Sequence, residues 1–268
     1  MYTFLYEERE EYIVDYSALF LCVAAFSVFF VALAKAGFGG MIGSLAMPLV
    51  ASVSDIPTAI SVLLPTYVVM DLIVAWSYRK VVPFSFVLPM ALSGVAGVFI
   101  AAILYRSVDV RYLAIFLGIM SLVIGFKFFV SQLVQKKESV AAVDPKTRNW
   151  PRLIGLNGAS GFTSFFLMGE APIQLFMLPF RMNPQIYVAV LVWFFCVINW
   201  IKIPIVLSMG IVTIDSLWIS AILLPIMPLG IIFGKYINSR IPKDPFYIVV
   251  HMLLIVLGGY LVADGIIH

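Results

Sequence analysis

Long apolar stretches follow one another along the whole chain, separated by charged residues, glycines and prolines. Most of the long stretches reach the roughly 20 residues that a helix needs to cross a bilayer core of about 30 Å. They are too continuous for the alternating strands of a membrane β-barrel. The pattern predicts an all-α polytopic membrane protein with apolar segments at about 17–34, 41–53, 58–78, 83–105, 110–131, 152–167, 171–181, 185–208, 214–236 and 245–266.

The order of these segments repeats. One long polar connection, about 132–150, separates two nearly equal halves. Each half opens with an apolar segment that stops at a glycine-containing break, continues as a short apolar leg, and ends with three long spans. Aligning Pro48 with Pro179 also brings Gly97 opposite Gly230 to within two residues. We therefore expect two repeats, each a broken-helix hairpin plus three transmembrane helices, with about eight to ten membrane segments in total.

Basic residues predict how the repeats are oriented. They gather in three connections, around 79–80, 136–152 and 235–243, and the positive-inside rule assigns such connections to the cytoplasmic side. If each hairpin enters and leaves on one side, three crossings per half remain, and this odd number inverts the second half. We expect inverted repeats in the cell membrane with both termini outside; a parallel arrangement of four plus four spans is the alternative. The expected divisions are an acidic outside segment 1–16, a first repeat 17–131, a cytoplasmic linker 132–151 and a second repeat 152–268.

Composition sets the class of partner. Hydrophobic residues make up 63% of the 268 residues and charged residues 12%, too apolar a balance for a water-soluble core. The expected surroundings are a lipid bilayer, with no nucleic acid. Cys22 and Cys196 lie in separate apolar runs, so neither a metal site nor a cofactor is expected. Aromatic residues near segment ends are expected to anchor at the membrane interface: Trp76, Tyr78, Trp150 and Trp218.

Ionisable residues inside the apolar segments are the candidates for chemistry. Lys35 precedes the first break, Glu170 lies in the second, and Asp71 is well inside the third segment. Lys202 lies inside the eighth segment beside Asn199. A central charge costs about 2.5–3.5 kcal/mol on insertion scales, so each needs a partner, a cavity or a function. Lys35 and Lys202 are candidates for the cationic side of an anion site, although Asp71 could simply neutralise either one.

The glycines of the first break extend this site. The stretch "KAGFGGMIGSLAMP" at 35–48 contains Gly37, Gly39, Gly40 and Gly43. Without side chains they let a ligand approach the backbone, and N–H groups that open a half-helix favour an anion. Close helix packing explains the same glycines equally well. Gln174, in the aligned stretch of the second break, completes the candidate substrate-binding set.

Several stretches together resemble the TauE/SafE family of sulfite exporters, from about residue 18 to the end. They are "AKAGFGGMIGSLAMPLV" and "AWSYRK" in the first half, and "GFTSFFLMGEAPIQLFMLP" and "FFCVINWIKIP" in the second. The resemblance implies a secondary transporter, exporter or permease, of sulfite, organosulfonates or related small sulfur-containing anions. It also implies coupling to protons.

The resemblance carries over to particular positions. Lys35 with its glycines matches the first glycine motif, Asp71 the aspartate of the following span, and Asn199 with Lys202 the Asn-Trp-Xaa-Lys stretch. The chain departs from the pattern at Glu170-Ala171-Pro172, where relatives tend to have Gly-Gly-Pro. The added carboxylate could narrow substrate choice, accept a proton or bind a cation. We expect alternating access, Glu170 or Asp71 as the proton-coupling group, and a possible homodimer.

Two other functions fit parts of the sequence. A passive anion channel would use the same breaks without a proton carrier. An intramembrane serine protease is suggested by Gly158-Ala159-Ser160-Gly161, with His251 as the base. His251 lacks the Ala-His-Xaa-Xaa-Gly setting of such proteases, and this reading leaves the duplication unexplained. We expect the protein not to be an enzyme.

Overall fold

The computed structural model describes residues 17–40, 46, 49–54, 56–105, 107–134, 149–167, 170–208, 210 and 212–267. Within these ranges the chain is helical and contains no strand, which confirms the all-α class. The elements are α1 (Ala18–Phe38), α3 (Ile56–Tyr78), α4 (Phe84–Leu104), α5 (Val110–Val134), α6 (Trp150–Leu167), α7 (Glu170–Met177), η1 (Leu178–Phe180), α8 (Pro184–Ser208), α9 (Ile214–Leu223), η2 (Leu224–Ile226), α10 (Met227–Arg240) and α11 (Lys243–Ile267).

Seven helical stretches of the described chain are long and apolar enough to cross a membrane: α1, α3, α4, α5, α8, the continuous α9–η2–α10 stretch and α11. Helix α6 and the short α7 with η1 are not among them, and they are the two legs on either side of the second break. Large apolar side chains such as Ile103 and Trp218 point away from the bundle and are strongly exposed. An apolar exterior of this kind suits lipid rather than water. The protein is therefore a multi-pass membrane protein.

The first break begins four residues later than the apolar pattern suggested. Helix α1 continues to Phe38 because Gly39 caps it in the left-handed conformation, with φ of 81°. The N–H of Gly39 donates to the Lys35 carbonyl at 3.1 Å, and the N–H of Gly40 donates to the Ala34 carbonyl at 3.2 Å. This is a glycine-terminated helix end. Lys35 therefore lies in the last turn of an intact helix, while most of the predicted leg at 41–53 falls outside the described residues.

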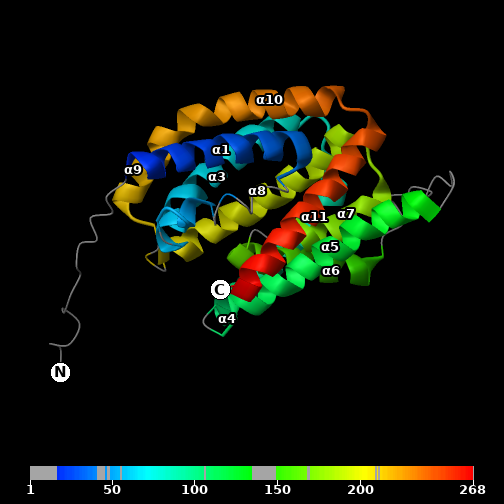
Figure 1. Ribbon diagram of the computed structural model, residues 1–268, viewed down its shortest axis with the longest axis horizontal. Helices are drawn as coiled ribbons and strands as arrows, with labels where there is room; N and C mark the ends of the chain where they lie inside the picture. Colours follow the sequence, from blue (N-terminus) through cyan, green and yellow to red (C-terminus); the bar gives the residue numbers. More distant parts are fainter. Residues whose placement is uncertain are drawn as a thin grey trace.

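The two halves pack against each other in reciprocal pairs. Helix α1 packs along α10, and α6, its equivalent in the second half, packs along α4. In the same way α3 contacts α9, and α8, its equivalent in the second half, contacts α4. The pairs α5 with α11 and α3 with α8 join equivalent elements of the two halves. Figure 1 shows α1 beneath α10, and α5 beside α11. Each half thus finds its main partners in the other half. This reciprocity supports the expected duplication, and the inversion of the second half stays a prediction.

Glycines let these pairs approach backbone to backbone. A Cβ atom added at Gly97 of α4 would lie 2.0 Å from the carbonyl oxygen of Gly158 on α6. One added at Gly230 of α10 would lie 2.4 Å from the carbonyl oxygen of Phe29 on α1. Gly97 and Gly230 are the positions that the repeat alignment places opposite each other. They serve the close packing of small residues that membrane helices use in place of a hydrophobic driving force.

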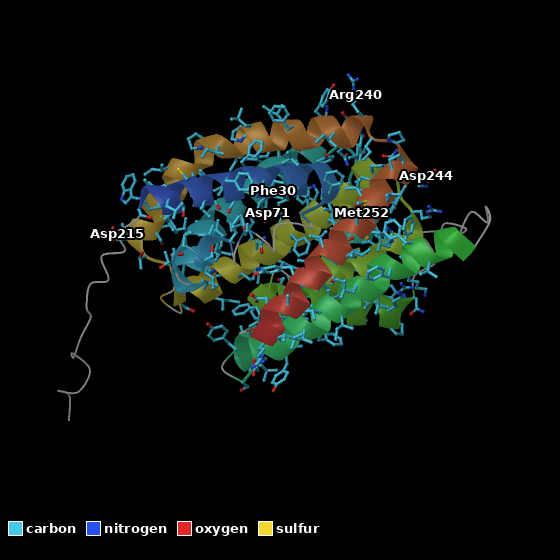
Figure 2. All side chains as sticks on the ribbon, viewed as in Figure 1. Phe30, Asp71, Asp215, Arg240, Asp244 and Met252 are labelled. Carbon is cyan, nitrogen blue, oxygen red and sulfur yellow. The ribbon has the colours of Figure 1, made fainter. Side chains whose placement is uncertain are left out.

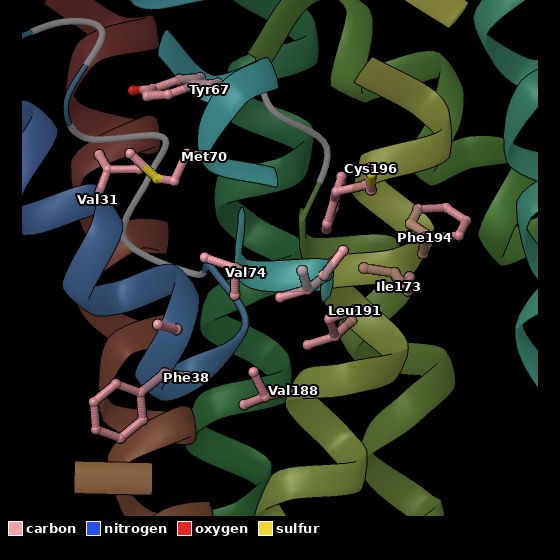
Figure 3. Close-up of a cluster of buried hydrophobic side chains, with 14 of the residues drawn as sticks. Val31, Phe38, Tyr67, Met70, Val74, Ile173, Val188, Leu191, Phe194 and Cys196 are labelled. Carbon is pink, nitrogen blue, oxygen red and sulfur yellow. The ribbon is translucent and has the colours of Figure 1, made fainter. Parts of the chain in front are cut away.

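Helix α8 lies at the centre of the bundle and contacts α1, α3, α4 and α10. The side chains of its first half are almost completely buried. Figure 3 shows Val188, Leu191 and Phe194 of α8 in one buried apolar cluster with side chains of α1 and α3, among them Val31, Phe38, Met70 and Val74. The apolar core therefore holds α8 in place, and α8 carries two of the candidate site residues.

Replacing Gly161 by alanine is expected to destabilise the protein, because the added Cβ would lie 1.8 Å from the carbonyl oxygen of Gly94. Overpacking of this kind costs about 1–3 kcal/mol. The matched control is Gly155→Ala on the same helix, where an added Cβ meets no atom within 4 Å. We expect the thermal unfolding midpoint in detergent to fall by several degrees for Gly161→Ala only. Equal midpoints for the two variants would contradict the close contact of α4 and α6.

Candidate functional site

Three polar side chains from three helices meet inside the bundle. The ammonium group of Lys35 on α1 forms an ion pair with Oδ1 of Asp71 on α3. Nδ2 of Asn199 on α8 donates a hydrogen bond of 2.5 Å to Oδ2 of the same carboxylate. Asp71 has no exposed surface at all. Figure 2 shows Asp71 in the middle of the molecule, whereas Asp215 and Arg240 lie at its periphery. The structure thus brings together three of the predicted site residues.

The surroundings of Lys35 favour its positive charge. It lies in the last turn of α1, where unpaired carbonyl groups give the helix end a partial negative charge. Its ammonium nitrogen lies 5.5 Å from the centre of the Tyr67 ring, within the range of a cation–π interaction. The charge of Lys35 is therefore compensated by Asp71, by the helix end and by an aromatic face.

Lys202 differs from Lys35 in its partners. It lies one helical turn beyond Asn199 on α8 and is only 4% exposed. Its ammonium group donates to the carbonyl oxygen of Ser164 at 2.9 Å. Among the described residues it forms no ion pair, although Asp71 and Lys35 are close enough to interact with it electrostatically. Lys202 is thus a buried cation bound to a neutral acceptor.

A cavity of about 50 Å³ adjoins Lys202. Its walls come from α3, α6 and α8 and include Leu63, Leu64, Phe165 and Phe166. A single water needs roughly 10–15 Å³ of such space, so the cavity has room for a small polyatomic group. The cavity therefore combines one cationic group with an otherwise mostly apolar lining.

The second break contributes a separate polar pair. The hydroxyl group of Tyr187 on α8 donates a hydrogen bond to Oε1 of Gln174 on α7, and neither residue is exposed. Nε2 of Gln174 has no hydrogen-bond partner among the described residues. Glu170 begins α7, but its side chain lies outside the described part of the structure, so its role stays a prediction. The leg that follows the break therefore carries a buried amide group that bonds to α8 through Tyr187.

The candidate glycines divide into different roles. Gly39 and Gly40 both have positive φ, of 81° and 104°, and form the turn that ends α1. Gly37 lies inside the helix, where an added Cβ would lie 3.2 Å from the carbonyl oxygen of Gly234. Gly37 therefore serves helix packing, and Gly43 lies outside the described residues.

The sequence analysis missed two residues that hold the end of α1. The hydroxyl group of Tyr78 donates to the carbonyl oxygen of Ala36 at 2.7 Å. Nδ2 of Asn238 on α10 donates to the carbonyl oxygen of Gly37 at 2.8 Å. These carbonyls belong to the last turn, where a helix leaves them unpaired. The prediction that Tyr78 anchors at the interface is wrong, because it is only 5% exposed. Nothing in the local sequence distinguishes it from the exposed Trp76 two residues earlier.

Ser160 and His251, the pair considered for an intramembrane protease, are both buried in the bundle. Nδ1 of His251 on α11 lies 2.6 Å from the carbonyl oxygen of Tyr247. The His251 ring also stacks on Phe128 of α5 at 3.8 Å between ring centres. His251 therefore packs between α5 and α11, and Ser160 is buried on α6. Within the described residues no group of three or more His, Cys, Asp or Glu could hold a metal ion.

The family model described as Sulfite exporter TauE/SafE matches residues 24–261. The chain belongs to the TauE/SafE family. As a TauE/SafE protein it is a multi-pass membrane transporter of the sulfite or anion exporter type. The matched range contains Lys35, Asp71, Asn199 and Lys202. Neither the curated proteins nor the solved structures gave a match to this chain.

The Lys35–Asp71 pair of this TauE/SafE protein is expected to behave as a coupled unit. Lys35→Met leaves a buried carboxylate without its cation, and Asp71→Asn leaves a buried ammonium without its anion. Removing one partner of a buried pair costs about 3–5 kcal/mol. The double variant Lys35→Met/Asp71→Asn is neutral at both positions, so we expect a smaller loss than the sum of the single variants. Thermal unfolding midpoints of the four proteins measure the coupling, and strictly additive losses would contradict it.

Proposed function

We propose that this protein is a secondary active transporter of sulfite, organosulfonates or related small sulfur-containing anions. It couples their movement to protons and works by alternating access. The observation that carries the proposal is Lys202, a buried cation beside a cavity and without a described carboxylate partner. A cation at membrane depth is costly unless it is paired or used, so it marks a substrate path.

The cavity beside Lys202 supports the choice of substrate. A sulfite or sulfonate head carries its charge on a few oxygens, which an ammonium group and backbone donors can bind. The apolar lining by Leu63, Leu64 and the two phenylalanines accommodates the small organic part of a sulfonate. Asn199, one turn away on the same helix face, supplies a second donor when it is released from Asp71.

The Lys35–Asp71 pair supports proton coupling by exchange of counterions. In the structure the carboxylate of Asp71 neutralises Lys35. When Asp71 takes up a proton, the ammonium group of Lys35 is left without its anion and can bind the substrate in its place. One proton thus enters with one negative charge, and the buried site keeps its net charge. Glu170, at the start of the second half-helix, is the other candidate for the proton.

The arrangement of the repeats supports alternating access. Transporters with inverted repeats place their sites at discontinuous helices near the bilayer midplane, and the two halves rock about that site. Here Lys35 lies on α1 at the first break, and Ser164, which accepts from Lys202, lies near the end of α6 at the second. The proposed site therefore lies between the two breaks.

Transport by the purified protein in proteoliposomes tests the substrate site. Lys202→Met is expected to lower the uptake of sulfite or sulfoacetate by about ten- to hundredfold, because a hydrogen bond to a charged group contributes about 1.5–3 kcal/mol. The control is Lys127→Met on α5, which removes an exposed lysine and should leave uptake unchanged. Unchanged uptake in both Lys202→Met and Lys35→Ala, in folded protein, would refute the site. A wild-type protein that transports none of sulfite, thiosulfate, sulfoacetate or taurine would refute the function.

Proton coupling is tested by imposing a pH gradient across the same liposomes. Wild-type protein should accumulate the anion against its gradient, whereas a channel would only equalise it. Asp71→Asn resembles the protonated carboxyl, so it should retain downhill flux and lose the uphill component. If Glu170→Gln loses the uphill component and Asp71→Asn keeps it, Glu170 carries the proton instead. Proton flux that persists in the double variant Glu170→Gln/Asp71→Asn would remove both residues as carriers.

A further inference from the structure

A groove between α4 and α6 lies outside the transport site. It has a volume of about 680 Å³ and almost no polar surface. Its floor is made of small residues, among them Ala96, Gly155 and Gly158, and its walls of large ones such as Leu92 and Phe162. Small residues on both helices create the hollow, because an added Cβ at Gly155 would meet no atom within 4 Å. A groove with so little polar surface favours an apolar occupant over an anion.

The groove has the length of one bilayer leaflet. The two helices run in the same direction, since Ser93 bonds to the Ile154 carbonyl and Gly97 approaches Gly158. Along α4 the groove extends from Pro89 to Ile100, twelve residues whose eleven helical steps span about 16 Å. Half of a hydrocarbon core of about 30 Å is about 15 Å. A single acyl chain entering from one membrane surface therefore fits the groove from end to end.

Basic residues lie near one end of the groove. Trp150 lines this end, and Arg152 lies in the first turn of α6 on the face that continues through Gly155. Arg79 and Lys80 lie in the turn that leads into α4, and therefore at the same end. The Arg152 guanidinium donates to the Leu175 carbonyl at 2.7 Å and remains exposed, with further N–H groups able to bind a phosphate. The opposite end, near Ile100 and Phe162, is apolar.

We propose that the α4–α6 groove binds an anionic phospholipid, with one acyl chain along the groove and the phosphate headgroup at Arg152. A basic site between membrane helices beside an apolar channel has the chemistry of a lipid site. Trp150 suits the level of the headgroups, where aromatic side chains gather. The lipid seals the hollow that the glycines of α6 leave open toward the bilayer.

The experiment is native mass spectrometry of the delipidated full-length protein, titrated with dioleoyl phosphatidylglycerol or dioleoyl phosphatidylcholine. We expect one phosphatidylglycerol to bind at least tenfold more tightly than phosphatidylcholine. Gly155→Leu places a side chain in the groove without a clash with the neighbouring helices, and it should weaken phosphatidylglycerol binding at least tenfold. Gly259→Leu on α11 is the matched control, because an added Cβ there also meets no atom within 4 Å. Arg152→Gln should abolish the preference between the two lipids while both still bind.

Three results would overturn the proposal. One is phosphatidylglycerol binding that Gly155→Leu leaves unchanged, and another is equal binding of the two lipids by the wild type. The third is a dimer that Gly155→Leu dissociates without any change in bound lipid, because a second copy of the chain would then cover the groove. Thermal unfolding midpoints equal to that of the wild type establish that the variants are folded. The test measures lipid binding and not transport, so failure of the lipid site can be distinguished from failure of the proposed function.

Discussion

The arrangement of the bundle depends on a charge that is buried among its helices. Lys35 lies at the end of α1 inside an apolar core, and among the described residues Asp71, the helix end and the Tyr67 ring compensate it. An unpaired charge at this depth would cost far more than any single packing contact contributes. The pair therefore fixes how α1 and α3 meet, and the bond from Asn199 ties the central helix α8 to the same carboxylate. The helices that carry the site are thus positioned by the chemistry of the site itself.

The residues proposed to take part in transport, Lys35, Asp71 and Asn199, therefore also stabilise the fold. Lys35 has a counterion within the protein, whereas Lys202 has a carbonyl oxygen and a cavity. In the proposed cycle Lys35 exchanges the carboxylate of Asp71 for the substrate anion. Lys202, which has no carboxylate partner among the described residues, also binds the substrate anion. Because one proton enters with one negative charge, the site has the same net charge when empty and when loaded, which lowers the cost of moving the substrate across an apolar region.

Much of this organisation follows from sequence, for identifiable reasons. Apolar stretches of fixed length have few alternatives in a bilayer, and an ionisable residue inside one of them needs a partner, so Asp71 could be predicted as a counterion of Lys35 or Lys202. Asn199 was expected beside Lys202 rather than as a partner of Asp71. The pairing of Lys35 rather than Lys202 with Asp71 depends on which helices meet, and no local pattern encodes that. Tyr78 looked like an interfacial residue because burial at a segment end is decided by α1 and α10, which are distant in sequence. Gly37 was ambiguous between ligand approach and packing until its neighbour was known to be Gly234.

The reciprocal pairing of the halves has a consequence for synthesis of the chain. Helices α1, α4 and α5 are made first, yet their closest partners are α10, α6 and α11, all encoded after residue 149. During translation the glycine surfaces of the first half therefore face lipid or the insertion machinery, and the last turn of α1 lacks the amide group of Asn238 that later binds it. The Lys35–Asp71 pair, the contact of Lys35 with the Tyr67 ring and the hydrogen bond from Tyr78 to the Ala36 carbonyl all lie within the first half. A nascent chain truncated at the linker would hold its charges together and leave its packing surfaces uncovered.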